Sequence, residues 1–265
     1  MDLESVSGPM RTAIAALTLL TATTASAGLW GDCSYTERRT AIAPAVGLTR
    51  IMIIGRAGTL HIAGRRGAAE VRATGTACSS DRDVLKHVLL TIQRTGSELR
   101  VEAEVPDTSD LFFGADASLD FEVAVPDSVA LVLEDGSGEM TIENVASADV
   151  TDGSGPLEIR NVGGDLRVRD GSGELLIDDV AGSVSITDGS GDITVRRVGS
   201  VNIVADGSGS VDIRNVKRDV VIGTKGSGSV DVADVGGDFR VGHKGSGHIE
   251  YQRVAGRVEI PERNR

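Results

Sequence analysis

The sequence predicts an all-β fold, a single-stranded parallel β-helix or β-solenoid with about 18 residues per coil. Gly-Ser-Gly recurs seven times between residues 136 and 247, at a nearly constant spacing. Each repeat also holds two short segments in which apolar residues alternate with other residues, which is typical of β-strands. Aromatic residues make up only 3% of the chain. The core must therefore be formed by Val, Ile and Leu on many short strands.

The repeat length indicates that one repeat is one flattened coil. Eighteen residues at about 3.3 Å each give a contour of about 59 Å, and two five-residue strands with two spans of about 10 Å need roughly 54 Å. Stacked coils place like residues above like, at a spacing of about 4.8 Å. The alternative is an antiparallel sandwich with Gly-Ser-Gly as hairpin loops, but a sandwich does not require a near-constant repeat length.

Two apolar pairs and one corner valine per repeat are expected to face inward. The same residue type in the same slot predicts a stack of valines through the core. The valines are Val145, Val162, Val180, Val198, Val216, Val235 and Val254. The first pairs are Met140/Ile142, Leu157/Ile159, Leu175/Ile177, Ile193/Val195, Val211/Ile213, Val230/Val232 and Ile249/Tyr251. The second pairs are Ala148/Val150, Leu166/Val168, Val184/Ile186, Val201/Ile203, Val220/Ile222, Phe239/Val241 and Val258/Ile260.

The repeated glycines are expected to be structural, because glycine accepts positive φ and leaves room for the backbone of the next coil. No histidine recurs in register with Ser137 and its equivalents, so these serines lack the base that a nucleophile needs. The turn glycines are Gly136, Gly138, Gly153, Gly155, Gly171, Gly173, Gly189, Gly191, Gly207, Gly209, Gly226, Gly228, Gly245 and Gly247.

The chain is predicted to have three parts: a signal peptide at 1–27, an irregular amino-terminal β region at 28–120 that begins the solenoid, and the regular solenoid at 121–265. Arg11 precedes an apolar run at 12–24, and Ala-Ser-Ala at 25–27 forms a cleavage pattern. The start is Met1 or Met10. No segment has the roughly 20 apolar residues of a transmembrane helix.

Within the amino-terminal region, alternation predicts strands at 58–64, 70–74, 86–93 and 98–105. Ser80 and Asp83 could instead begin a short helix that continues into Val84, Leu85 and Val88. We favour the strand at 86–93, because the β-rich run at 88–92 is followed by a Thr-Gly-Ser turn.

Export also affects how the two cysteines are interpreted. An even count of two cysteines in an oxidising compartment predicts a disulfide between Cys33 and Cys78, which would stabilise the fold by roughly 4 kcal/mol.

The net charge of the chain limits the possible partners. It is −12, and it becomes −11 without the leader, which holds one basic and two acidic residues. This acidity argues against nucleic acid and anionic lipid as partners.

An acidic residue precedes Gly-Ser-Gly in five successive units, at Asp135, Asp152, Asp170, Asp188 and Asp206, and Lys225 and Lys244 replace it in the last two. A cation could neutralise this row. Calcium, however, needs six to eight oxygens, and the repeat lacks the nonapeptide of calcium-binding β-rolls. We therefore expect solvated, turn-capping aspartates, with no metal and no cofactor. His243 and His248 also lack a third ligand at useful spacing.

No catalytic residue is predicted. Glycoside hydrolysis needs two carboxyl groups about 5 to 9.5 Å apart, and connections of three to five residues cannot build the walls of a cleft around them. The carboxylates considered for this role are Asp178, Asp179, Asp192, Asp212 and Asp231. Phe112 and Phe113, in the long connection at 107–118, are a candidate partner contact, because exposed aromatic residues can anchor a partner.

The segment at 121–138, FEVAVPDSVALVLEDGSG, and the Gly-Ser-Gly units after it resemble the bacterial adhesin-like β-strand-repeat families, the DUF4097 and head-GIN-like group. The resemblance covers roughly residues 50 to 260. It implies a right-handed parallel β-helix in the cell envelope and brings no catalytic residues. We expect a non-catalytic exported protein, periplasmic or at the cell surface, that binds an envelope protein or polysaccharide. The alternative is a carbohydrate-active or calcium-binding β-helix.

Overall fold

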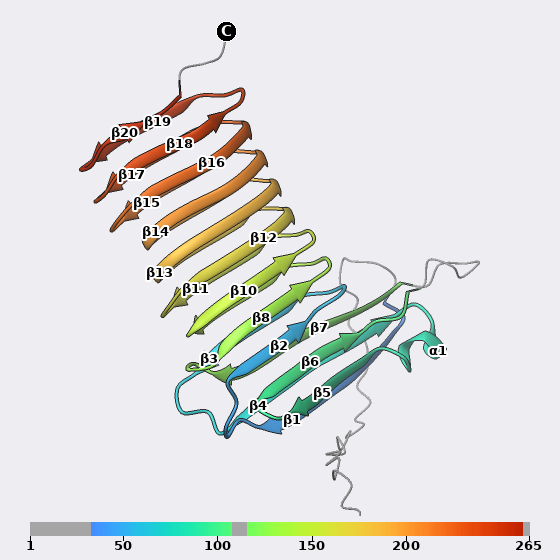
Figure 1. Cartoon of the computed structure of the whole chain (residues 1–265). Coiled ribbons are helices and arrows are strands. Elements are labelled where there is room, and N and C mark those ends of the chain that lie inside the picture. The colour runs from blue at the N-terminus through green and yellow to red at the C-terminus, as the bar shows by residue number, and fades with distance from the viewer. Residues whose placement is uncertain (1–32, 108–115, 262–265) are drawn as a thin grey trace, which may run out of the picture.

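The computed structural model describes residues 33–107 and 116–261. The predicted signal peptide at 1–27 and the candidate contacts Phe112 and Phe113 lie outside the described residues. Short parallel strands form the successive coils of a β-solenoid, which rises from the amino-terminal region to the carboxy-terminal end (Figure 1). The predicted solenoid, with coils of about 18 residues, is confirmed. The antiparallel-sandwich alternative is wrong for the repeat region, because its strands pair in parallel.

Strands of the coils stack into two parallel faces. The first face holds β7 (Ala117–Pro126), β3 (Leu60–Arg65), β9 (Met140–Val145), β11 (Leu157–Val162), β15 (Val211–Val216), β17 (Val230–Val235) and β19 (Ile249–Val254). The second face holds β6 (Glu98–Glu104), β2 (Arg50–Ile54), β8 (Ala130–Asp135), β10 (Ser147–Asp152), β12 (Leu166–Ser172), β16 (Val220–Ser227), β18 (Phe239–Lys244) and β20 (Val258–Glu259). Two long strands, β13 (Leu175–Ser190) and β14 (Ile193–Ser208), bend through both faces.

The register places like residues above like, as the repeat predicts. Val162, Val180 and Val198 are paired partners in successive coils, and the valine column is buried from Val145 to Val235. Each coil thereby covers the apolar edge that the previous coil leaves open.

Two backbone devices close each coil. The residue before the corner valine has a left-handed φ of 53° to 60° in every Gly-Ser-Gly coil, and this turns the valine into the core. The second glycine of each Gly-Ser-Gly also has a positive φ, and a Cβ added there would lie only 1.7–2.0 Å from the carbonyl oxygen of the glycine one coil below. The residues with this left-handed φ before the corner valine are Asn144, Asn161, Asp179, Arg197, Asn215, Asp234 and Arg253.

The amino-terminal region contains a coil that is out of sequence order. The strands β2 and β3 lie between β6 and β8 on one face and between β7 and β9 on the other. Ala57 occupies the serine slot of this coil and pairs with Ser137. Antiparallel strands follow below, because β1 (Tyr35–Pro44), β4 (Glu70–Ser79) and β7 pair in that order, and β5 (Leu89–Thr95) pairs with β6.

A short helix and a disulfide lie at this end of the solenoid. Helix α1 (Arg82–Leu85) forms, as in the less favoured alternative, and the strand expected at 86–93 is also present as β5, although β5 begins only at Leu89. The Oδ1 atom of Asp81 accepts the backbone N–H groups of Asp83 and Val84 and so caps the helix. The predicted Cys33–Cys78 disulfide is present, with 5.5 Å between the Cα atoms.

Arg39 ties strand β1 to the helix. Its side chain is buried, its Nε donates to the Val88 carbonyl at 2.8 Å, and Nη2 donates to the Leu85 carbonyl at 3.1 Å. The guanidinium also lies 2.8 Å from the Glu37 carboxylate. The amino-terminal end of the core is therefore covered by hydrogen-bonded structure.

The carboxy-terminal end is not covered in the same way. Tyr251, expected to face inward, is 51% exposed, although its ring still packs against that of Phe239 with 6.1 Å between the ring centroids. Ile249, Val254, Val258 and Ile260 are only partly buried. Their side chains face inward, but within the described residues no further coil follows to cover them. No helix among the described residues is both long and apolar enough to cross a membrane.

Candidate functional site

The aspartates before the Gly-Ser-Gly turns form a buried column, which we call the acidic column. Its members are only 1–8% exposed, so the expectation of solvated aspartates is wrong. Each strand extends as far as the aspartate, and alternate side chains of a strand point to the same side. Asp152 therefore points inward two residues after buried Val150, and Asp170 two residues after buried Val168. The column consists of Asp135, Asp152, Asp170, Asp188 and Asp206, which are paired in register from coil to coil.

The first four aspartates of the column have no counter-charge among the described residues. Both carboxylate oxygens of Asp135, Asp152, Asp170 and Asp188 are buried and have no hydrogen-bond partner of ordinary geometry. Successive coils lie about 4.8 Å apart, so adjacent carboxylates are near neighbours. An arrangement of this kind is costly unless protons or cations neutralise it.

Burial shifts the titration of these groups strongly. It raises the pKa of Asp135 to about 6, although the Gly136 backbone N–H opposes part of that shift. Burial, together with the neighbouring carboxylates, raises the pKa of Asp152 to about 7 and that of Asp188 to about 7. The pKa of Asp170 is raised by burial as well. At neutral pH the column therefore holds carboxyl groups that are poised between their two protonation states.

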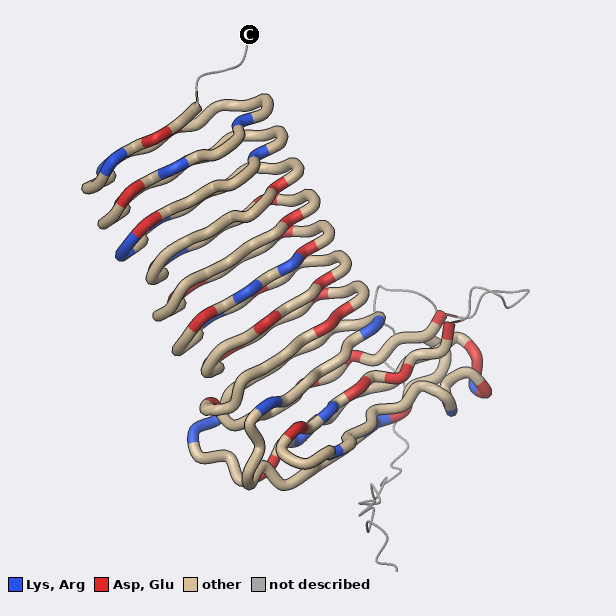
Figure 2. The backbone as a smooth tube through the Cα atoms, viewed as in Figure 1, with Lys and Arg blue, Asp and Glu red and all other residues tan. Residues whose placement is uncertain are grey.

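The column ends in an internal ion pair. Lys225 occupies the next position in register and is only 2% exposed. Its Nζ lies 2.7 Å from Oδ2 of Asp206 and donates to the carbonyl oxygens of Gly209, at 2.8 Å, and of Ser227. Figure 2 shows acidic segments at one edge of successive coils, with basic segments at the last two coils. Lys244, which follows Lys225, is partly buried.

The carboxylates considered for glycoside chemistry do not form an unpaired couple. Asp178 is paired with Arg197, and Asp212 and Asp231 lie on either side of Arg214, at 2.9 and 3.2 Å. The other two carboxylates, Asp192 and Asp179, occupy separate structural positions. Asp192 accepts the Ser210 backbone N–H at 2.7 Å, and Asp179 is exposed at the left-handed corner position.

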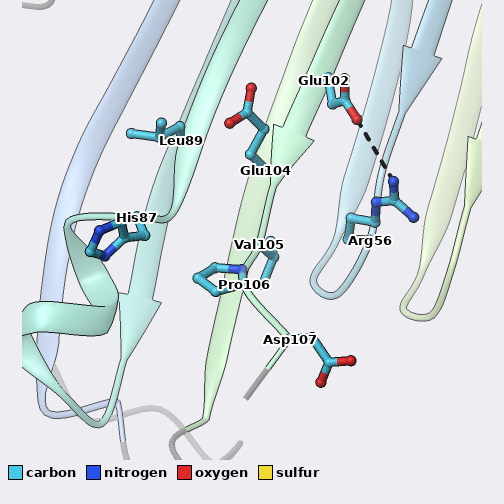
Figure 3. A pocket seen from close by; sticks show the side chains of 8 residues that line it. All are labelled: Arg56, His87, Leu89, Glu102, Glu104, Val105, Pro106 and Asp107. Atoms are coloured by element: carbon cyan, nitrogen blue, oxygen red, sulfur yellow. Dashed lines mark ion pairs between the residues drawn. The ribbon is translucent and has the colours of Figure 1, made fainter. Parts of the chain in front are cut away.

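The hollow drawn in Figure 3 is open to solvent and lies beside β5 and β6. It is lined by Arg56, His87, Leu89, Glu102, Glu104, Val105, Pro106 and Asp107. Arg56 and Glu102 form an ion pair at 3.7 Å, and Glu102 also pairs with Arg100 at 2.8 Å, which lowers the Glu102 pKa. Arg56, Arg100 and Glu102 therefore form one charge-paired cluster at the side of the hollow.

Metal ligands of the usual side-chain kind do not converge in the described part of the chain. No three His, Cys, Asp or Glu side chains gather there as a candidate metal site. His243 and His248 are both exposed, and Nε2 of His248 lies 3.4 Å from Oε1 of Glu250. Any cation in the acidic column would therefore need backbone oxygens as additional ligands.

The outer faces carry fixed charges of both signs. Arg167 and Arg169 of one coil pair with Asp149 of the coil below, at 3.4 and 3.0 Å. At the corner, Arg253 pairs with Asp234 of the preceding coil, at 2.5 Å. Such pairs link charged side chains of neighbouring coils on the outer surface.

Three solved structures are similar to this chain at low level. A candidate cell adhesion protein from Clostridium sporogenes shares 14% identity, with 85% of this chain and 99% of that chain covered and a TM-score of 0.40. A candidate lipid binding protein from Parabacteroides distasonis shares 14% identity over 84% and 97%, with a TM-score of 0.39. A candidate adhesin from Bacteroides fragilis shares 13% identity over 84% and 97%, with a TM-score of 0.26.

No protein-family model matches the chain. No curated protein matches it either. The similarity to the solved structures is too low to assign a family, so membership of the DUF4097 and head-GIN-like group stays a prediction.

Proposed function

We propose that this protein is a non-catalytic, exported envelope protein of adhesin-like type, whose solenoid faces bind an envelope protein or polysaccharide. The observation that carries the proposal is a set of ion pairs between neighbouring coils on the outer surface, namely Asp149 with Arg167, Asp178 with Arg197, and Asp234 with Arg253. A rigid surface with fixed charges at several coil heights suits an extended partner. The same short turns that keep the faces open leave no walls for a catalytic cleft.

Export is supported by the leader pattern at 1–27 and by the Cys33–Cys78 disulfide, since disulfides persist in oxidising compartments. The test is expression of the chain with its own leader, followed by intact-mass measurement of protein from the periplasm and the medium. We expect cleavage after Ala27 and no alkylatable thiol. A retained leader or two free thiols in exported protein would contradict the proposal.

Binding is tested with immobilised mature protein and two separate probes, isolated envelope polysaccharide and detergent-solubilised envelope proteins. The Debye length is about 8 Å at physiological salt and about 3 Å at 1 M. Retention through the charged faces should therefore fall steeply with salt. Contacts through Phe112 and Phe113 would instead persist at high salt and be lost in Phe112→Ala and Phe113→Ala.

The same preparations distinguish binding from catalysis. We expect retention without release of reducing sugars or peptides from the envelope material. Release of product that disappears when one aspartate, such as Asp212, is replaced by Asn would show an enzyme and overturn the proposed function.

A further inference from the structure

The acidic column leaves four buried carboxylates without a counter-charge, although the protein neutralises the fifth. Asp206 is paired with Lys225, whereas Asp135, Asp152, Asp170 and Asp188 have no cationic partner among the described residues. The register is continuous from Asp135 to Lys225, so all these side chains occupy equivalent positions inside successive turns.

Lys225 shows that the interior of such a turn accommodates a cation. Its coil keeps the register of the coils before it, with Asp206 opposite Lys225 and Ser208 opposite Ser227. Its ammonium group contacts three oxygens: a carboxylate oxygen of Asp206 in the coil below and the carbonyl oxygens of Gly209 and Ser227. A cation bound by a carboxylate and two backbone carbonyls is therefore already present at one level of the column.

The same backbone carbonyls recur at the levels that lack a lysine. The Gly209 and Ser227 carbonyls correspond by register to those of Gly173 and Ser190 at the level of Asp170 and Asp188. The Ser190 carbonyl accepts the Gly173 N–H at 3.0 Å and keeps a second lone pair for another contact. Each gap between adjacent aspartates is thus lined by two carboxylates and by two backbone carbonyl oxygens, which together could bind a cation.

We propose that the acidic column binds Ca²⁺, with one ion between Asp135 and Asp152 and one between Asp170 and Asp188. The donors are all oxygens, which hard cations prefer. Ca²⁺ accepts six to eight oxygens in a flexible geometry, whereas Mg²⁺ requires a near-ideal octahedron, so a site of side-chain carboxylates and fixed backbone carbonyls favours Ca²⁺.

Charge balance sets the stoichiometry. Two divalent ions neutralise the four unpaired carboxylates, and Lys225 already neutralises Asp206. Occupying alternate gaps keeps the two ions about two coil spacings apart, which weakens their mutual repulsion. Water would complete the coordination, because Ca²⁺ takes six to eight oxygens. This inference concerns the core and is independent of the partner proposed for the outer faces.

The test is calorimetric titration of chelator-treated, full-length mature protein with CaCl₂ at pH 8, together with thermal unfolding with and without the ion. We expect about two Ca²⁺ per chain, a higher Tm with Ca²⁺, and at least tenfold weaker binding of Mg²⁺. Asp170→Asn should reduce the stoichiometry to about one. Asp179→Asn, an exposed aspartate outside the column, should leave it at two.

A second variant keeps the proposal falsifiable if Asp170→Asn does not fold. Lys225→Asp removes the internal ammonium and leaves Asp206 with a carboxylate neighbour, so the stoichiometry should rise from two to three. An unchanged stoichiometry in folded Lys225→Asp would overturn the assignment of the ions to the column. So would a wild-type Tm that responds to pH but not to Ca²⁺, since protons alone would then neutralise the carboxylates.

Discussion

The unfolding free energy of the calcium-free protein should fall as the pH rises from 5 to 8. In the unfolded chain these aspartates titrate near 3.8, so they are ionised across this range. In the folded protein the pKa of Asp152 and of Asp188 is about 7, so both hold their protons at pH 5 and release them by pH 8. The folded state binds more protons than the unfolded state below pH 7, and stability therefore decreases as the pH rises.

The size of the effect follows from the pKa values. One pKa unit corresponds to about 1.4 kcal/mol, so a group with a folded pKa of about 7 loses about 3 kcal/mol of stabilisation between pH 5 and pH 7. Asp135, with a folded pKa of about 6, loses about 1 kcal/mol over the same range. These contributions interact, because the carboxylates are neighbours, so we expect a total decrease of several kcal/mol.

Urea unfolding followed by far-ultraviolet circular dichroism, with chelator present at pH 5, 6, 7 and 8, measures this decrease. Asp188→Asn should remove at least about 2 kcal/mol of it, because the amide does not ionise. Asp179→Asn is the matched control, since Asn144 and Asn161 occupy the same corner slot in other coils. A flat pH profile of the wild type, or a profile in Asp188→Asn equal to that of the wild type, would refute the reasoning.

Further substitutions test the packing of the coils by thermal and urea unfolding. Val198→Asp buries an unpaired charge at a fully buried position and should cost several kcal/mol, whereas Val204→Asp, at a 49% exposed position, should cost little; equal effects would remove the register described above. Gly191→Ala places a Cβ 1.7 Å from a carbonyl oxygen of the coil below and should lower the Tm sharply, so an unchanged Tm would show that the turns yield freely. Replacing Cys33 and Cys78 together by Ser should lower the free energy of unfolding by about 4 kcal/mol. The wild type should lose the same stability when its disulfide is reduced, and reducing buffer should leave the double mutant unchanged.

The repeat region was predictable because its signals are local and repeated. Like residues must stack in a solenoid, so seven valines in one slot define the register without any long-range information. The corner also had a readable signal that we did not use. Asn144, Asn161 and Asn215 precede the corner valines, and asparagine is among the residues that tolerate a left-handed φ.

The burial of the acidic column was mispredicted for a specific reason. Aspartate beside glycine usually caps a solvated turn, and this preference outweighed the strand alternation that places Asp170 on the same side as Val168. The amino-terminal end was beyond sequence reasoning for another reason. The hydrogen bonds of Arg39 to Val88 and Leu85 join positions that lie far apart in the chain, and they leave no periodic trace in the sequence.

The out-of-order coil formed by β2 and β3 determines how the chain can assemble. From β10 onwards each coil pairs only with the coils next to it in sequence, so these coils can add one at a time once the first coils exist. The β2–β3 coil, by contrast, pairs on both sides with strands that come much later in the chain. A chain emerging from its amino terminus therefore makes these strands first but must hold them unpaired until β6 to β9 arrive. Closure of this long loop should form the slow nucleus of folding, and rapid elongation toward the carboxy terminus should follow.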